Sequence, residues 1–275
     1  MAKTMNSEPR DPKNTLVVDS LNLAYRWKIS GKDYDLPYGF KDTVQSLAKS
    51  YNCGKVLVLG DGGSAWRKSL HPGYKLSRKL KFNNQTEQEK NESEEFFRYY
   101  QSALDTCGFP VIKLPGVEAD DIAAYIVENK CRLDINDIWL ISSDKDWDLL
   151  IEEDVSRFST VTRKEITIDT WDYPVERDQY ADFKTLIGDP GDDIPGVDGI
   201  GPKRAAELIE QYGSVFDIIA SLPLKGKAKY IEKLNASKDS MILSYQLIDL
   251  RSFHEDAIGE NLSKLESILD EIYLR

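Results

Sequence analysis

Three short apolar segments of this 275-residue chain each lead into an aspartate, and helical patterns separate them. Alternation of this kind predicts an α/β fold with a mostly parallel central sheet and helices on both faces. In such sheets ligands bind at the carboxyl ends of the strands, so the three aspartates are predicted to meet at one edge. The segments and their aspartates are Leu16–Val18 with Asp19, Lys55–Leu59 with Asp61, and Ile138–Ile141 with Asp144, and the helical patterns cover Thr43–Ser50, Glu87–Thr106 and Ala119–Lys130.

The pattern becomes helical from about Pro174 onward, with Gly- and Pro-rich punctuation near residues 188–202. We therefore predict a flexible tail (1–14), an α/β core (15–175) and a helical C-terminal region (176–275). The first fourteen residues are polar and lack the apolar core of a signal peptide. No apolar run approaches the ~20 residues that span a bilayer. We expect a cytoplasmic monomer with no membrane partner.

The numbers of cysteines and histidines limit the kinds of catalytic and metal site that this chain can form. The three cysteines are odd in number and scattered, which argues for reduced, packed thiols rather than zinc sites or a disulfide framework. Only two histidines are present, which disfavours His-based zinc sites and Ser–His–Asp triads. The chemistry is therefore predicted to depend on carboxylates. The net charge of −11 disfavours nucleic acid as a partner, but the positive charge is strongly clustered.

Further acids accompany the three strand-end aspartates. Each of them alone has an ordinary explanation, because acids cap helices and occupy turns. Together they would repel one another by about 4 kcal/mol per pair at ~4 Å and an effective dielectric near 20. Divalent cations offset such repulsion, and an all-oxygen ligand set favours two Mg²⁺ or Mn²⁺ ions, a common device for phosphodiester hydrolysis. The additional acids are Glu118, Asp120, Asp121, Asp146, Asp189 and Asp192.

A basic stretch follows Asp61. Between Arg67 and Lys81 there are six basic residues and no acid, with Tyr74 within the stretch. Its ordinary interpretation is a solvated helix face or a mobile loop. Its functional interpretation is a clamp, in which Arg and Lys contact phosphates and an aromatic ring stacks on a splayed base.

The most specific signal is the segment GDPGDDIPGVDGIGPKRAAELI, which starts at Gly188. Its glycines allow a tight turn and close backbone approach, and Pro202 suits the first position of a helix. The N-terminus of that helix offers N–H groups to a phosphate, and the next two residues are basic. This pattern predicts a helix–hairpin–helix over about 184–213 that grips DNA without reading bases. The residues concerned are Gly196, Gly199, Gly201, Lys203 and Arg204.

These motifs resemble the 5′-nuclease family, which includes flap endonucleases, the 5′-nuclease domain of bacterial DNA polymerase I and stand-alone enzymes of tailed bacteriophages. VVDSLNLAYR is similar to the family's first acidic motif and HPGYKLSR to its arch motif. GVEADD and SSDKDWDLL match the central motifs, and the glycine-rich segment matches the helix–three-turn–helix. The match covers about residues 15–250 and is closest to the phage enzymes. It implies a PIN-like fold with a helical arch at about 66–100.

The resemblance also implies roles. One metal ion would be held by Asp19, Asp61, Glu118 and Asp120, and the other by Asp121, Asp144, Asp146, Asp189 and Asp192, partly through water. The catalytic residues would be Lys75, Arg78 and Asp146, with Lys75 and Arg78 reaching the scissile phosphate. K⁺ would bind at the hairpin around Val197–Ile200. The residues that contact DNA would be Arg26, Arg67, Tyr74, Lys75, Arg78, Lys79, Lys184, Gly196, Gly199, Gly201, Lys203 and Arg204.

The implied activity is that of a 5′ flap endonuclease and 5′→3′ exonuclease, which leaves 5′-phosphate and 3′-hydroxyl ends in DNA replication or repair. The substrate would be DNA with a 5′ flap or a single-stranded 5′ end, and a phage-encoded enzyme would act in the host cytoplasm. Asp193 stands where many relatives have Asn, so we expect extra negative charge at the second metal site. No polymerase domain follows, which fits a free-standing enzyme. A PIN-type ribonuclease, a non-catalytic branched-DNA-binding protein and, more remotely, a phosphatase are the alternatives.

Overall fold

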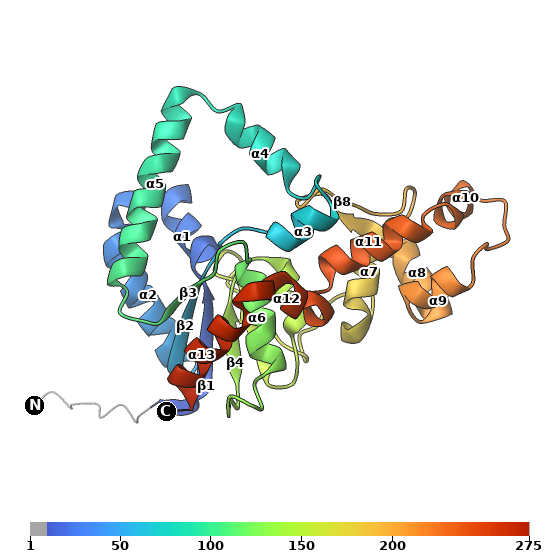
Figure 1. Ribbon diagram of the computed structural model, residues 1–275. Helices are drawn as coiled ribbons and strands as arrows, with labels where there is room; N and C mark the ends of the chain where they lie inside the picture. Colours follow the sequence, from blue (N-terminus) through green and yellow to red (C-terminus); the bar gives the residue numbers. More distant parts are fainter. Residues whose placement is uncertain (1–9, 275) are drawn as a thin grey trace, which may run out of the picture.

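The computed structural model describes residues 10–274, and a six-stranded sheet of order β3-β2-β1-β4-β5-β6 forms its centre (Figure 1). All neighbouring strands are parallel except β5 and β6. The predicted α/β fold with a mostly parallel sheet is therefore confirmed. The strands are β1 (Asp11–Asp19), β2 (Cys53–Gly60), β3 (Val111–Lys113), β4 (Ile138–Ile141), β5 (Val155–Phe158) and β6 (Glu165–Ile166).

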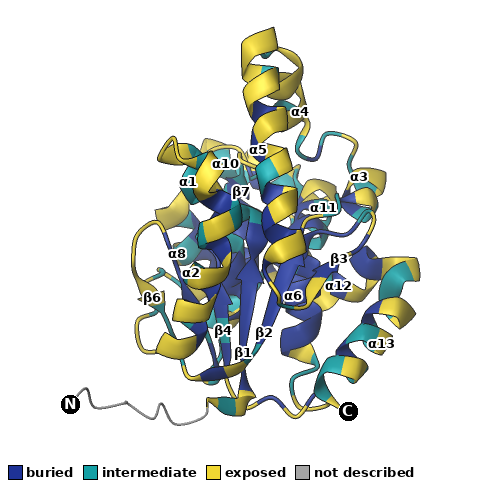
Figure 2. Cartoon of the chain, turned by 90° about the vertical axis from the view of Figure 1, so that its left-hand side faces the viewer, coloured by how far each residue is buried: buried dark blue, intermediate teal, exposed yellow. Residues whose placement is uncertain are grey.

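Alternate side chains of the central strands pack into two separate hydrophobic cores, one on each face of the sheet. Leu16 and Val18 of β1 pack on the face covered by α1 (Ser20–Ile29), α2 (Leu36–Ser50) and α5 (Glu87–Thr106). Val17 packs on the opposite face, which α6 (Ala119–Glu128) covers. Because successive side chains of a strand point to opposite faces, continuous apolar runs are what a sheet covered on both sides requires. Figure 2 shows the strands buried beneath these layers.

The first strand begins earlier than predicted. Its pairing with β2 starts at Asp11, opposite Cys53, so residues 11–14 are not part of a tail. The Asn52 side chain also accepts a hydrogen bond from the Asp11 amide at 3.4 Å. Residues 11–14 lie at the end of the sheet and have polar side chains. They therefore show no apolar pattern from which a strand could be predicted. Residues 1–9 of the predicted tail lie outside the described residues.

The helical C-terminal region shares a core with α6. Helix α12 packs directly on α6, and α7 packs on both α8 and α11. Within residues 10–274, no helix has both the length and the apolarity to cross a bilayer. The region contains η3 (Arg177–Gln179), α7 (Tyr180–Ile187), β7 (Gly188–Asp189), β8 (Ile194–Pro195), α8 (Pro202–Tyr212), α9 (Val215–Ala220), α10 (Lys229–Asn235), α11 (Lys238–Ile248), α12 (Leu250–Ile258), η4 (Gly259–Asn261) and α13 (Leu262–Tyr273).

An arch of helices projects beyond the sheet, and α4 and α5 form its two sides (Figure 1). It is built from α3 (Ala65–Leu70), α4 (Leu76–Asn83) and the long α5. A capping box between Thr86 and Glu89 fixes the start of α5 at the turn between the two sides. The outer parts of α4 and α5 are exposed in Figure 2. Two 3-10 turns complete the chain, η1 (Asp33–Asp35) and η2 (Lys145–Leu150).

We expect Asp182→Asn to stabilise the fold at neutral pH. Asp182 is buried on α7 and accepts a hydrogen bond from the Val215 amide at 2.8 Å. Burial, with a smaller contribution from Asp249 and Asp217, raises its pKa to about 6. The unfolded chain releases this proton near pH ~4, so the ionised side chain destabilises the folded state above that pH. Asparagine keeps the acceptor and removes the charge.

Urea unfolding should show the variant more stable by about 1–2 kcal/mol at pH 8, with the gain shrinking steadily between pH 7 and pH 4. A gain that did not depend on pH would contradict this assignment.

Candidate active site

The acids at the ends of β1 and β4 are joined by hydrogen bonds through Ser142. Asp19 ends β1 and caps α1 by accepting a bond from the Asn22 amide at 3.1 Å. The Ser142 hydroxyl donates to Asp19 at 2.9 Å and accepts from the Asp144 amide at 3.1 Å. Ser142 therefore fixes the spacing of two predicted metal ligands. Ser142 was not among the residues predicted for the site.

The acids at this edge raise one another's pKa values. Burial raises the pKa of Asp19 to about 7, and the charges of Asp144 and Asp61 add to the effect. Burial and Asp144 raise the pKa of Asp120 well above its ordinary value. Burial and Asp146 likewise raise the pKa of Asp144. Buried carboxylates that disfavour one another's charge are the donor chemistry that a divalent cation relieves, so these residues fit such an ion.

Asp120 and Glu118 frame the start of α6. The Trp147 indole N–H donates to Asp120 at 2.6 Å, a contact that sequence analysis missed. The buried Glu118 carboxylate accepts from Tyr74 at 3.0 Å and forms an ion pair with Lys75. Burial alone would raise the pKa of Glu118, but Lys75 and other cations hold it below its ordinary value.

Arg67 lies behind this edge rather than on the surface. Its guanidinium donates to both oxygens of Asp121 at 2.8 Å, to Glu118 at 3.0 Å and to the Leu247 carbonyl at 2.9 Å. Only 2% of Arg67 is exposed. The prediction that Arg67 contacts DNA is therefore wrong, because α3 turns the side chain inward. Asp121 is likewise satisfied by Arg67, so any part it plays at a metal ion would be indirect.

Tyr74 also departs from its predicted role. Its ring is 4% exposed, and its hydroxyl donates to Asp192 as well as Glu118, each at 3.0 Å. A buried ring has no free face on which a base could stack, so Tyr74 is a structural residue of the site. Arg78 also forms an ion pair with Asp192 and is about half exposed, so it remains available to a phosphate.

A second acidic group surrounds Lys184. The Lys184 ammonium forms ion pairs with Asp146 and, at 3.1 Å, with Asp189. A cleft of about 630 Å³ opens beside them, lined also by Asn22 and Asp144. The prediction that Lys184 contacts DNA is wrong, because its buried ammonium is held between two carboxylates. Lysine at this position balances the charge of the predicted second metal site.

Among residues 10–274, no three Asp, Glu, His or Cys side chains are arranged as a ready-made metal cage. Several acids of the site are instead paired with cationic side chains, which explains why no such cage is formed. These acids are Glu118, Asp121, Asp146, Asp189 and Asp192. The acids do meet along one edge, as the electrostatic coupling of Asp19, Asp61, Asp120 and Asp144 requires. Their assignment as ligands stays a prediction.

The side chain of Asp193 contacts the arch, and the extra charge expected from it at the second metal site stays a prediction. Its carboxylate accepts a hydrogen bond from the Ser77 amide of α4 at 2.8 Å. Its φ of 58° places it in the left-handed region that Asn and Asp tolerate better than most residues. The hydrogen bond from Ser77 also lowers the pKa of Asp193.

The predicted helix–hairpin–helix is formed by α7, the β7–β8 hairpin and α8 (Figure 1). A side chain at Gly196 would lie 2.4 Å from the Ile187 carbonyl oxygen, so this glycine permits the hairpin to pack on α7, and its contact with DNA stays a prediction. Gly199 has a φ of 80°, and Gly201 precedes Pro202, the first residue of α8. Arg204 donates to the Gly199 carbonyl and lies 4.2 Å from the Tyr230 ring centroid, so it braces the turn.

The other predicted DNA contacts differ in exposure. Lys79 on α4 is exposed, the Lys203 side chain is 92% exposed at the start of α8, and Arg26 is partly buried on α1. Lys79 and Lys203 are therefore free to approach a phosphate backbone, as the prediction for them requires.

We expect Lys203→Ala to weaken DNA binding without slowing the chemical step. Loss of one phosphate contact should reduce the slope of log K against log salt by about 0.9. The slope should be measured with a flap duplex in EDTA, where binding is separated from cleavage. Lys264→Ala, which changes an exposed lysine on α13, is the matched control and should leave the slope unchanged. An unaltered slope for Lys203→Ala would remove this residue from the DNA interface.

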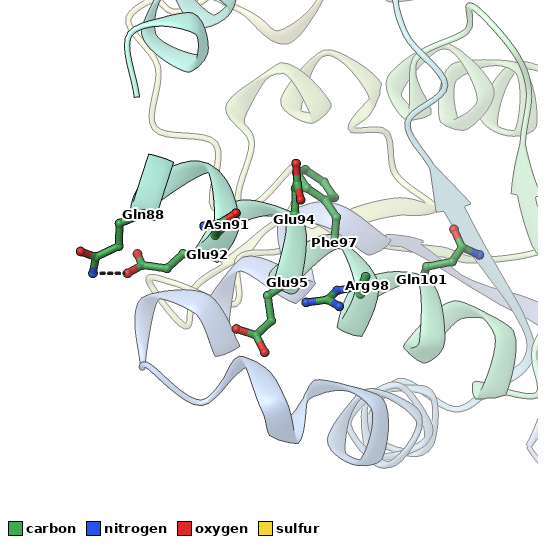
Figure 3. A pocket seen from close by; sticks show the side chains of 8 residues that line it. All are labelled: Gln88, Asn91, Glu92, Glu94, Glu95, Phe97, Arg98 and Gln101. Atoms are coloured by element: carbon green, nitrogen blue, oxygen red, sulfur yellow. Dashed lines mark hydrogen bonds between the residues drawn. The ribbon is translucent and has the colours of Figure 1, made fainter. Parts of the chain in front are cut away.

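A concave surface larger than the cleft beside Lys184 lies elsewhere, on α5 of the arch (Figure 3). It measures about 900 Å³, and every residue that lines it belongs to this one helix. Glu92, Glu94 and Glu95 give it a negative charge. This surface is formed by one exposed, acidic helix, so side chains from different elements do not meet there. Such side chains do meet at the edge of the sheet, and we therefore place the active site at that edge.

Family models match almost the whole chain. The model described as "5'-3' exonuclease, N-terminal resolvase-like domain" matches residues 14–176, and "5'-3' exonuclease, C-terminal SAM fold" matches residues 175–267. The flap endonuclease of Escherichia phage T5 is 42% identical over 259 residues, which are 92% of this chain and 89% of that protein. The flap endonuclease Xni of Shewanella woodyi is 31% identical over 260 residues, which are 90% of this chain and 96% of that protein.

Solved structures agree with these relatives. A phage T5 flap endonuclease in a pseudo-enzyme-product complex with DNA and metal ions has a TM-score of 0.90 at 41% identity, covering 95% of this chain and all of that one. A phage T5 5′-exonuclease with bound zinc has a TM-score of 0.88 at 41% identity, covering 94% and 98% of the two chains. The catalytic core of Rad2 with DNA substrate, at 16% identity and a TM-score of 0.51, shares the fold.

Proposed function

Because the chain belongs to the 5′–3′ exonuclease family and is a metal-dependent nuclease, we propose that it cuts DNA at the base of a 5′ flap and also degrades DNA from a 5′ end. The observation that carries this proposal is the position of Lys75. It comes from the base of the arch, and its ammonium is paired with Glu118 at the acidic edge of the sheet. A cation at that edge can meet a phosphate that enters from the arch.

Two basic surfaces support the proposed substrate. Arg78 and Lys79 on α4 give the arch an exposed basic side, which suits a single-stranded 5′ end. The start of α8, with exposed Lys203, suits the backbone of the adjoining duplex. A branched DNA can engage both surfaces, whereas the acidic part of α5 should repel it. We infer removal of flaps or primers in replication or repair as the biological role, in the host cytoplasm if the chain is phage-encoded.

We assign the first cation to Asp19, Asp61, Glu118 and Asp120. The second would lie near Asp144, Asp146, Asp189 and Asp192, with Asp121 acting indirectly through Arg67. Oxygen ligands of this kind favour Mg²⁺ or Mn²⁺. When bound, such ions polarise the phosphate and favour attack by water.

The chain's own residues position the phosphate and balance charge. Lys75 offsets the negative charge that develops on the scissile phosphate, and Arg78 orients the strand. Lys184 forms ion pairs with Asp146 and Asp189. Burial alone would raise the pKa of Asp189, but the ion pair with Lys184 holds it below its ordinary value. We further propose a monomer, and a K⁺ ion held by backbone carbonyls around Val197–Ile200.

The decisive experiment is cleavage of a 5′-end-labelled flap duplex with Mg²⁺, Mn²⁺ or EDTA. We expect release of the flap near the junction with either metal and no product in EDTA. The product should carry a 3′-hydroxyl that a polymerase can extend. Binding without cleavage would favour a non-catalytic branched-DNA-binding protein. Faster cleavage of the matching RNA would favour a PIN-type ribonuclease.

A further inference from the structure

Helix α4 of the arch has no side-chain cap from its own N-terminal residue. Helix α4 begins at Leu76, and the residue before it, Lys75, has a left-handed φ of 55° and makes no capping bond with its side chain. The first N–H groups of a helix have no partner within the helix and are normally satisfied by a neighbouring Ser, Thr, Asp or Asn. Here Asp193, 116 residues further along the chain, supplies an acceptor to the Ser77 amide at 2.8 Å.

The same turn of the hairpin holds the helix at other points. The Lys75 amide donates to the Asp192 carbonyl at 3.0 Å. Arg78 donates to the Gly191 carbonyl at 3.1 Å and forms an ion pair with Asp192. Residues 191–193 therefore surround the first turn of α4. Two carboxylates contact this turn of α4, those of Asp192 and Asp193, and only that of Asp193 is not a predicted metal ligand.

We propose that Asp193 is a positioning residue, which fixes the start of α4 and thereby places the Lys75 ammonium at the acidic edge. This inference rests on the proposed function and adds a connection between the DNA-binding hairpin and the arch. Lys75 directly precedes the helix, so a displacement of its first turn moves the ammonium away from Glu118. A negative charge at a helix N-terminus is also favoured by the helix dipole.

Three substitutions separate the hydrogen bond from the backbone conformation. Asp193→Ala removes the acceptor and should slow single-turnover cleavage of a flap duplex about tenfold. Asp193→Asn keeps an acceptor and tolerates the left-handed φ, so its rate should stay within about twofold of wild type. Asp193→Gly relieves the backbone but offers no acceptor, so it should be as slow as Asp193→Ala. The affinity for the duplex in EDTA should not change.

A double-mutant cycle tests whether the effect passes through Lys75. In a Lys75→Ala background, Asp193→Ala should slow cleavage no further, because there is no ammonium to place. A full tenfold effect in that background, or a wild-type rate for Asp193→Gly, would overturn the proposal.

Deuterium uptake of residues 76–79 gives a readout that does not require activity. It should rise in Asp193→Ala and not in Asp193→Asn, and equal uptake in wild type and Asp193→Ala would also overturn the proposal. Failure of wild type to cut a flap would instead refute the proposed function and leave this readout intact.

Discussion

Asp120→Asn is expected to lower the single-turnover rate of flap cleavage at least a thousandfold while leaving the fold intact. Asp120 lies in the first turn of α6, and its charge is disfavoured by burial and by Asp144. In the active enzyme a cation would relieve that repulsion and require the charged carboxylate. A loss of about 4 kcal/mol of electrostatic stabilisation corresponds to about a thousandfold in rate.

Stability separates this role from a structural one. Asparagine can still accept the Trp147 indole hydrogen bond and lacks the disfavoured charge, so thermal unfolding in EDTA should occur no earlier than in wild type. Asp169→Asn, at an exposed loop position, is the control and should cut normally. A rate within tenfold of wild type at saturating Mg²⁺ would show that Asp120 is not a ligand.

Lys75→Ala is expected to reduce the rate about 10²–10³-fold, the usual effect of removing one group that stabilises developing negative charge. Binding of the flap duplex in EDTA should change far less. Lys264→Ala, which changes an exposed lysine on α13, is the matched control and should leave both the rate and the binding unchanged.

The dependence on Mg²⁺ distinguishes two explanations for such a loss. Lys75 competes with a cation for Glu118, so its removal should not raise the Mg²⁺ concentration that gives half the maximal rate. If saturating Mg²⁺ restored the wild-type rate, Lys75 would serve the metal site rather than the phosphate.

The strands with periodic apolar residues and the hairpin rich in Gly and Pro could be predicted from the sequence alone. Apolar runs such as Leu16–Val18, each ending near an aspartate, determined a parallel sheet with acids at one edge, because strand direction fixes where the carboxyl ends lie. The glycines around Gly199, followed by Pro202, determined the hairpin before α8, because few other residues suit those backbone positions. These are local properties, and each is encoded within about twenty residues.

Only the tertiary structure decided which charged side chains face solvent. Arg67 and Lys184 are basic residues of the kind that contact DNA, yet both are buried. Arg67 pairs with Asp121, 54 residues away, and Lys184 pairs with Asp146, 38 residues away. Ser142 and Trp147 orient acids at the edge, although nothing in their local pattern distinguishes them from a turn and a core residue. Asp193 caps a helix 116 residues away. Pairings of this kind depend on the packing of the arch and the hairpin against the sheet, because the balance between burial and ion pairing is set by neighbours that sequence spacing does not specify.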